Sequence, residues 1–456
     1  MFPAWDPTAL RLVAPMRGIA NLRSQPPHRG ILRISPTNIL LTPSTLIVGI
    51  DIAKDKHVAR AQDDRGIEFG KRLIFENRIH GYQKLLDWVS RHQKEHQKTH
   101  VIFGVEPTGH FWLSLAYFLT AKGYDFVLVN PMHVKKTKEL DDNSPTKNDT
   151  KDARVIAQLI KDGRYSVPNL LDGIYAELRE GVKLRDQLIQ QLMITEGRIQ
   201  NHIQRYFPEF FDVFKDWEGK AALCTLRNFP FPSQIKEMTS EEVLAKWKQE
   251  VNRGVGIKRA TKLIEAAKKS IGIQIGIKFA KRELDYLLDQ YELYKEQLGQ
   301  LDKDLEALVV TIPGAKEMIN IQGLGPTTVA LFFAEVGDIT KYSHPQQLVN
   351  LAGLSLREHS SGKFKGQTKI TKRGRSRLRR ALYLAIRPLV AHNPTFKALH
   401  QYYTKRPDRP LKKQQSLIAL CCKLLRVLFV IGQKQCEFDG SKLLRGLPQI
   451  DSLQAA

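Results

Sequence analysis

The chain has 456 residues, of which 71 are Lys or Arg and 47 are Asp or Glu, so its net charge is +24 and its pI is near 9.8. This length provides for two or three domains and excludes a small fold that depends on disulfides. The excess of positive charge indicates a polyanionic partner, with nucleic acid the leading candidate and an anionic membrane surface the alternative.

The apolar runs and cysteines indicate where the protein is located. A spanning helix needs about 18–20 apolar residues, and the richest run, 416–432, is interrupted by Lys423 and Arg426. The four cysteines lack paired CxxC spacing, which predicts neither a cysteine zinc site nor disulfides. We therefore expect no membrane association and a cytoplasmic, nucleoid-associated protein.

Residues 1–44 are rich in arginine and proline and predict a flexible basic arm, although a misplaced start codon would explain them equally well. After them, "LIVGIDIA", "HVARAQDD" and "GIEFGKRLIFEN" predict three strands joined by turns, followed by alternating helices and strands. This order predicts an α/β fold in residues 45–165, an RNase H-like (RuvC-like) domain with a mixed sheet. Tyr117, Phe118 and Tyr124 are predicted to be core residues.

A helical region is predicted for residues 166–312. The stretches 175–215 and 280–311 have the apolar periodicity of antiparallel coiled-coil arms, and serve either dimerisation or an intramolecular hairpin. A mainly helical C-terminal domain follows in 313–435, with a tail at 436–456. Within it, "INIQGLGPTTVALFFAEVGD" predicts two helices joined by a Gly-rich turn that either only connects them or holds a phosphate.

Four acids on three predicted elements form the candidate catalytic set. Asp51 lies in an apolar strand, Glu106 ends the strand "VIFGVEP", and Asp149 and Asp152 are spaced to share one face of a helix. Carboxylates brought together in this way need divalent cations, so the set predicts Mg²⁺ for phosphoryl transfer. A helix N-cap at Asp149 and a helix-dipole partner at Asp152 are the structural alternatives, and Asp142 could replace either acid.

These motifs resemble those of a known family. "GIDIAKDKH", "VEPTGHFW", "VNPMHVKKTKE" and "KNDTKDA" resemble the N-terminal DEDD domain of the IS110-type transposases. "GLGPTTVALFFAEVGD", "LVNLAGLSLREHSSG" and "ITKRGRSRLRRALY" resemble the IS116/IS110/IS902 transposase domain. The resemblance covers residues 46 to about 432. It implies a DNA recombinase of an insertion sequence that combines a RuvC-like acidic site with a serine, and a structured RNA from the element that selects the target.

The motif "EHSSGK" matches best with Ser360 at the family's nucleophile position. The family often has two glycines after the serine pair, but here Gly362 is followed by Lys363, so Ser361 remains an alternative. Attack of the serine on a DNA phosphate would form a covalent phosphoserine intermediate. Basic residues surround these serines with few acids among them, which predicts contact with the nucleic-acid backbone. They are Arg357, Lys363, Lys365, Lys369, Lys372, Arg373, Arg375, Arg377, Arg379 and Arg380.

Three other functions compete with this reading. A RuvC-like nuclease that selects DNA structures would use the same acids and Mg²⁺ for hydrolysis, without a serine. A sugar-kinase-like phosphotransferase would share the "GIDIAKDK" strand, but Ala53, Lys54 and Asp55 stand where phosphate loops usually carry Gly, Ser or Thr. A nucleic-acid-binding scaffold would have lost catalysis, yet all four acids are present. We expect a dimer or tetramer, because strand exchange requires several cuts.

Overall fold

The computed structural model describes residues 39–141, 149–251, 255–357, 360–361, 364–365 and 369–445. The predicted basic arm therefore lies almost wholly outside the described residues. The chain forms two compact units. The first contains the described residues up to Tyr175, Asn320–Leu324 and those from Glu335 onward, and the second contains Ala176–Ile319 and Gly325–Ala334.

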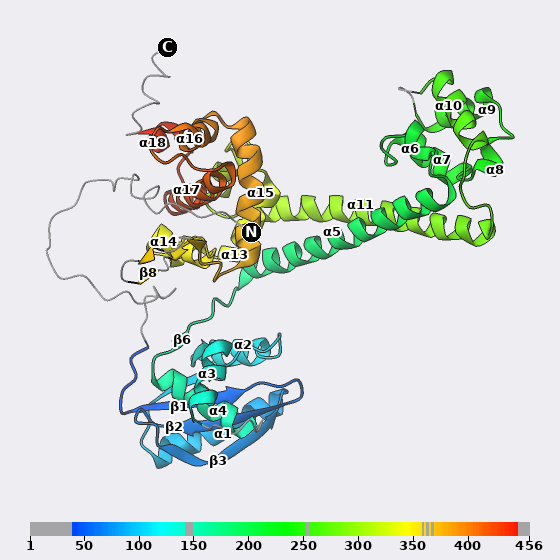
Figure 1. Cartoon of the computed structure of the whole chain (residues 1–456). Coiled ribbons are helices and arrows are strands. Elements are labelled where there is room, and N and C mark those ends of the chain that lie inside the picture. Colours follow the sequence, from blue (N-terminus) through cyan, green and yellow to red (C-terminus); the bar gives the residue numbers. More distant parts are fainter. Residues whose placement is uncertain are drawn as a thin grey trace. The chain divides into compact units, whose positions relative to one another are not determined.

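A six-stranded mixed sheet lies in the first unit (Figure 1). Its strands are β1 (Thr45–Asp51), β2 (Lys56–Gln62), β3 (Glu68–Glu76), β4 (His100–Val105), β5 (Asp125–Val129) and β6 (Tyr165–Ser166). They are arranged in the order β3-β2-β1-β4-β5-β6. β2 is antiparallel to β1 and β3, β4 and β5 run parallel to β1, and the short β6 closes the edge antiparallel to β5. The predicted mixed sheet is confirmed.

Helices cover both faces of this sheet, which explains why "LIVGI" in β1 is continuously apolar. The helices are α1 (Ile79–Glu95), α2 (Leu113–Ala121), α3 (Pro131–Asp141) and α4 (Asp149–Lys161). Leu46, Val48 and Ile50 pack with α1 and α2, whereas Ile47 packs with α3 and α4. Because side chains alternate along a strand, Asp51 belongs to the face that carries α4.

Helix α4 packs directly on the backbone of β1 at Gly49. A Cβ added at Gly49 would lie 2.5 Å from the Ala157 nitrogen and closer still to the Ala153 carbonyl oxygen. Only glycine leaves room for this approach, which brings the first turn of α4 next to the end of β1.

We expect Gly49→Ala to lower the free energy of unfolding of the sheet domain by about 1–3 kcal/mol, because the methyl group must push the helix off the strand. Differential scanning calorimetry of the full chain measures the change. The control is Gly299→Ala, at an exposed helical position with nothing within 4 Å of the new Cβ. That change is expected to stabilise by up to about 1 kcal/mol. Equal effects at the two glycines would contradict the packing argument.

The prediction that Tyr117 is a core residue is wrong. Phe118 and Tyr124 pack against the core, as expected. Tyr117 is 46% exposed, and its hydroxyl donates to the Leu171 carbonyl oxygen at 2.8 Å. It lies on the outer side of α2, where a phenol can keep its polar end in contact with water and backbone.

The second unit contains a helical hairpin with a globular tip (Figure 1). Its long helices are α5 (Gly173–Tyr206) and α11 (Ile277–Val309). Arg185 Nε donates to Asp302 Oδ1 at 2.5 Å near one end, and His202 Nδ1 lies 3.4 Å from Glu283 Oε2 near the other. These contacts pair the helices antiparallel within one chain, so the intramolecular hairpin that we left open is confirmed.

Five short helices form the tip of this hairpin around an aromatic core. They are α6 (Phe210–Val213), α7 (Lys220–Asn228), α8 (Pro232–Ile235), α9 (Ser240–Glu250) and α10 (Ile257–Lys268). Trp247 is fully buried there, and its indole N–H donates to Thr225 Oγ1 at 2.9 Å. The aromatic residues of this segment therefore form a packed core of their own.

The C-terminal part is mainly helical, as predicted. Its helices are α12 (Ala315–Ile319), α13 (Pro326–Val336), the 3₁₀ turn Ile339–Lys341, α14 (Pro345–Leu351), α15 (Ser376–His392), α16 (Pro394–Lys405), α17 (Lys413–Lys434) and α18 (Gly440–Leu444). α17 is long and apolar enough to span a membrane by length and composition, but 61% of its apolar window is buried. It packs against α14, α15 and α16, as the central helix of a core does.

Candidate active site

The strand register places Asp51 and Glu106 side by side. β1 and β4 are parallel, and Ile50 is level with Val105. Asp51 is the last residue of β1, and Glu106 directly follows β4, so both lie at the carboxyl edge of the parallel strands. Both residues are only partly exposed. The carboxyl edge of a parallel sheet is the usual place for a binding site in α/β proteins.

Asp152 reaches the same edge from helix α4. It precedes Ala153, whose carbonyl oxygen packs against Gly49, two residues before Asp51. The charge of Asp152 acts on the Glu106 carboxyl, so the two acids are near neighbours. Asp149 opens α4 one turn before Asp152, and its side chain lies outside the described residues. The structure thus brings three of the four predicted acids together.

A lysine that the sequence did not indicate joins these acids. Lys138 on α3 forms an ion pair with Asp152 and also acts on Glu106. Its ammonium group supplies part of the positive charge that clustered carboxylates require. The only signal in the sequence was "VKKTKE", which has three lysines and no periodicity that distinguishes one of them. Residues 142–148, which include Asp142, lie outside the described residues.

Burial raises the pKa of Glu106, the Lys138 charge opposes this shift, and the Asp152 charge adds to it. A carboxyl group whose ionisation is disfavoured by burial and by a neighbouring carboxylate is a common feature of a site that binds a cation or performs catalysis. His57 supports the loop after Asp51, because its Nδ1 accepts the Ala53 N–H at 3.3 Å. No pattern in the sequence indicated a role for this buried histidine.

Glu106→Gln is expected to raise the free energy of unfolding of the metal-free protein at pH 7. The folded-state pKa of Glu106 lies above its unfolded value, so ionisation destabilises the fold as pH rises through that interval. The gain should shrink as the pH falls toward the ordinary glutamate value, where both states are protonated. Thermal unfolding between pH 4 and pH 8 in EDTA measures it. Glu139, an exposed residue of α3, provides the control Glu139→Gln, and identical profiles for both variants would refute this prediction.

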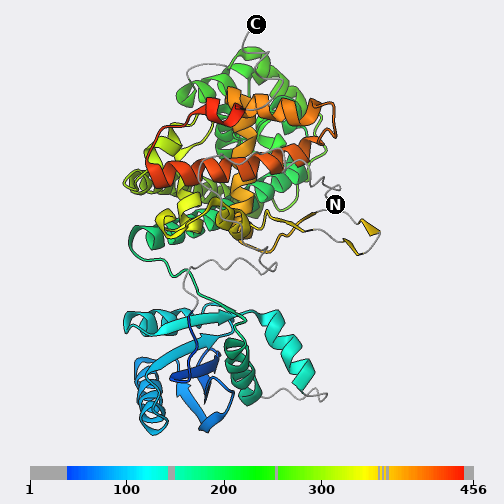
Figure 2. The same ribbon diagram turned by 90° about the vertical axis from the view of Figure 1, so that its left-hand side faces the viewer.

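The serine pair lies on a β-ribbon between α14 and α15. β7 (Leu356–Arg357) pairs with β10 (Lys369–Ile370) at its base, and β8 (Ser360–Ser361) pairs with β9 (Phe364–Lys365) further out. Figure 2 shows these strands in yellow, projecting beyond the helices of this part. The side chains of 358–368 lie outside the described residues, so the contacts of both serines do too.

Two arginines of the predicted basic run join the start of α15 to neighbouring helices. Arg375 forms an ion pair with Glu335, at 3.7 Å between Nη1 and Oε2, and Arg379 Nη1 donates to the Ala352 carbonyl oxygen at 2.9 Å. Other residues of the run are exposed. They are Arg357, Lys369, Lys372, Arg373, Arg377 and Arg380. Contact of these residues with nucleic acid stays a prediction. Arg375 and Arg379 have a structural role as well.

The Gly-rich turn before α13 connects packed helices. Gly323 has a φ of +94°, and a Cβ there would lie 3.1 Å from the backbone of Pro388 and Leu389 in α15. Glycine is needed at position 323 because of this backbone conformation and because the backbone of α15 lies so close. Of the two interpretations left open, this observation favours the connecting turn.

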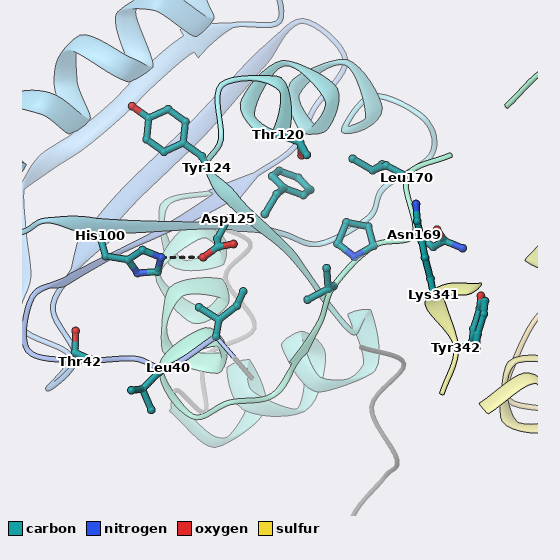
Figure 3. A pocket seen from close by; sticks show the side chains of 14 residues that line it. Leu40, Thr42, His100, Thr120, Tyr124, Asp125, Asn169, Leu170, Lys341 and Tyr342 are labelled. Carbon is teal, nitrogen blue, oxygen red and sulfur yellow. Dashed lines mark hydrogen bonds and ion pairs between the residues drawn. The ribbon is translucent and has the colours of Figure 1, made fainter. Parts of the chain in front are cut away.

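A cavity of about 690 Å³ lies at the opposite edge of the sheet from the acids. His100 begins β4, Asp125 begins β5, and His100 Nε2 lies 2.8 Å from Asp125 Oδ2 in its wall (Figure 3). Because these residues are at the amino ends of the parallel strands, the cavity and the carboxylate cluster are separate features.

Comparison with known proteins gives the class of this protein. Residues 48–208 match the model of the DEDD transposases of the IS110 type, and residues 315–401 match that of the IS116/IS110/IS902 transposase family. The chain is therefore a transposase, and it belongs to the IS110 family. Members of this class act on DNA by cleaving and recombining strands.

Similar proteins come from several bacteria. The 44.8 kDa protein of insertion element IS116 from Streptomyces clavuligerus is 25% identical over 390 residues, 84% of this chain and 94% of the relative. The 43.6 kDa protein of insertion element IS110 from Streptomyces coelicolor is 24% identical over 62% of this chain and 70% of the relative. The transposase for insertion sequence IS1111A from Coxiella burnetii is 32% identical over 25% of this chain and 31% of the relative.

Proposed function

We propose that this transposase cleaves and exchanges DNA strands with a Mg²⁺-dependent acidic site and a serine nucleophile. The observation that carries the proposal is the meeting of Asp51, Glu106 and Asp152 at one edge of the sheet. The strand order, three antiparallel strands followed by parallel ones, supports an RNase H-like (RuvC-like) domain. We assign this domain to residues 45–165, the helical region to 166–312 and the serine-bearing domain to 313–435.

The donor set fits Mg²⁺. Three partly buried carboxylates lie at this edge of the sheet, and carboxylate oxygens are the ligands that this hard cation prefers. Asp51, Glu106 and Asp152 would hold it, together with Asp149 from the first turn of α4. When bound, Mg²⁺ supplies activation of an attacking oxygen and charge stabilisation at a phosphate.

Ser360 is the proposed nucleophile, with Ser361 as the alternative. Its Oγ forms a bond to a DNA phosphorus as the bond from phosphorus to a deoxyribose oxygen breaks, and the hydroxyl proton is transferred to the departing oxygen. The phosphoserine ester conserves the energy of the broken bond, which permits rejoining to a new strand. The proposal requires the serine ribbon to reach the acidic site. The two would come from one chain or from two copies in a dimer or tetramer.

The exposed basic residues beside the ribbon would bind the DNA backbone, so affinity should fall steeply as salt concentration rises. Backbone contacts do not select a sequence. A structured RNA encoded by the element would select the target instead, as the family resemblance implies.

Lys138→Met is expected to tighten Mn²⁺ binding several-fold, because the lysine and the metal compete for Asp152. Methionine keeps most of the apolar stem and removes the charge. Mn²⁺, a paramagnetic substitute for Mg²⁺, is titrated into metal-free protein and the unbound ion is measured by electron paramagnetic resonance. Lys136→Met, at an exposed position on the same helix, is the matched control. Unchanged or weaker binding in Lys138→Met would show that the ammonium does not compete with the metal.

Covalent capture tests the proposed function. The protein is mixed with Mg²⁺, RNA from the flanks of its element and end-labelled junction DNA, and then separated on a denaturing gel. A protein–DNA adduct that forms with Mg²⁺ and not with EDTA is the expected result. Metal-dependent cutting without an adduct would identify a hydrolytic nuclease. Binding without any cutting would identify a non-catalytic scaffold.

A further inference from the structure

The last turn of helix α1 and its C-cap carry three potential metal ligands, away from the acidic cluster. His92, Glu95 and His96 are spaced three and four residues apart, which places them on one side of a helix end. One ligand atom of each lies within 4.8 Å of the other two. His92 Nδ1 is 3.5 Å from Glu95 Oε2. Two histidines four residues apart on a helix are a recurrent arrangement for binding zinc.

His92 gives an independent indication of a ligand. His92 is only 6% exposed, and within the described part of the chain neither ring nitrogen makes a hydrogen bond of normal geometry; its Nδ1 has only the 3.5 Å contact with Glu95. Buried polar atoms are nearly always paired, so an unpaired imidazole requires an explanation.

Strand β3 holds the two histidine rings in place. Gly70, with a φ of +59°, lies against His92, and a Cβ there would be 2.9 Å from Cε1 and 3.3 Å from Nε2. The backbone therefore covers the Nε2 side of this ring, while Nδ1 faces Glu95. His96 stacks on Phe69, with ring centroids 3.8 Å apart and an angle of 7° between the planes. Both rings are thus positioned by contacts from another element, as ligands of a preformed site are.

We propose that His92, Glu95 and His96 bind a zinc-class divalent transition metal, with water as the fourth ligand. Two imidazole nitrogens and one carboxylate oxygen suit Zn²⁺, Co²⁺ or Ni²⁺ and not Mg²⁺. Metal–nitrogen bonds of about 2.0–2.1 Å require the donors to approach to about 3.4 Å. Rotation of the exposed Glu95 side chain, with a shift of His96 within its stack on Phe69, would achieve this.

The site would lie at the end of α1, where its two histidine rings pack against the start of β3. It lies on the sheet face covered by α1 and α2, whereas Asp51 belongs to the face covered by α4. The metal site is therefore separate from the acidic cluster and does not depend on the proposed catalytic mechanism.

Cobalt titration of the full-length, untagged protein tests the proposal. The protein is stripped with a chelator and returned to excess Mg²⁺, which saturates the acidic cluster, before Co²⁺ is added. We expect visible absorption of four-coordinate Co²⁺ that saturates at one equivalent and is lost when Zn²⁺ is added. His96→Ala and Glu95→Gln should each weaken binding at least about ten-fold, since even loss of an outer partner costs about 10–100-fold. His80→Ala is the matched control, because His80 is an exposed histidine of the same helix paired with a single acid, Glu76.

Thermal unfolding gives a second measurement. Zn²⁺ is expected to raise the Tm of the wild type and of His80→Ala, and to leave that of His96→Ala unchanged. Glu95→Gln, at an exposed carboxylate, keeps the test decisive if His96→Ala fails to fold. The proposal is overturned if the wild type binds Co²⁺ no better than Glu95→Gln, or if Zn²⁺ shifts the Tm of both equally.

Discussion

Asp152→Asn is expected to lower the rate of DNA strand cleavage at least about 10³-fold, with the fold intact. Asparagine has nearly the same shape, but it loses the charge through which Asp152 pairs with Lys138 and acts on Glu106. Metal-based charge stabilisation contributes several kcal/mol to such reactions, and each 1.4 kcal/mol is about ten-fold in rate. Cleavage of labelled junction DNA under single-turnover conditions measures the effect, and circular dichroism checks the fold.

The control for this prediction is Asp162→Asn. Asp162 is exposed just beyond the other end of α4, where its carboxylate accepts from Gln158 Nε2 at 3.2 Å. Its loss should leave cleavage within two-fold of the wild type. If Asp152→Asn retained normal cleavage, the carboxylate cluster would be a structural feature and not the catalytic site. Restoration of activity by Mn²⁺ in place of Mg²⁺ would instead strengthen the assignment of Asp152 as a ligand.

Ser360→Ala is expected to abolish the covalent protein–DNA adduct and to reduce strand exchange at least about 10⁴-fold. Removal of a nucleophile eliminates the covalent route, and the losses in comparable systems reach about 10⁶-fold. The remaining rate would come from binding and charge stabilisation. The adduct is quantified by denaturing gel electrophoresis of labelled DNA, and Mn²⁺ binding confirms that the acidic cluster is undisturbed.

Ser361→Ala is the matched control, since Ser361 adjoins Ser360 on the same short strand. It should keep the adduct and most of the activity. The opposite outcome, with the adduct lost only in Ser361→Ala, would assign the nucleophile to Ser361. Adducts in both single variants and in the double variant would exclude the ribbon as the source of the nucleophile.

Several elements of the fold could be read from local pattern. The run "LIVGIDIA" predicted an apolar strand, and β1 is buried along nearly its whole length, because continuous apolar sequence in a short element needs cover on each side. The periodicity of 175–215 and 280–311 predicted the two long helices, but not their pairing. That pairing depends on contacts such as Arg185 with Asp302, which local spacing does not encode.

Local pattern was less reliable where an element is short or one face is open. The strand β6 consists of Tyr165 and Ser166 alone and has no periodicity to detect. Tyr117 shares the apolar composition of α2 but lies on its outer side, and the sequence does not state which side of a short apolar helix meets the sheet. Both differences arise because neighbours distant in the chain determine burial.

The sequence by itself determined the family and the mixed sheet, and it predicted Asp51, Glu106 and Asp152 as candidate acids, because these depend on residue type, order and strand or helix period. Only the tertiary structure decided that Lys138 neutralises Asp152, that Gly49 admits α4, and that β3 covers His92. Each of these contacts joins residues that are 14 or more positions apart in the chain. Their geometry follows from the register of the strands and the packing of helices on them, which a linear pattern does not contain.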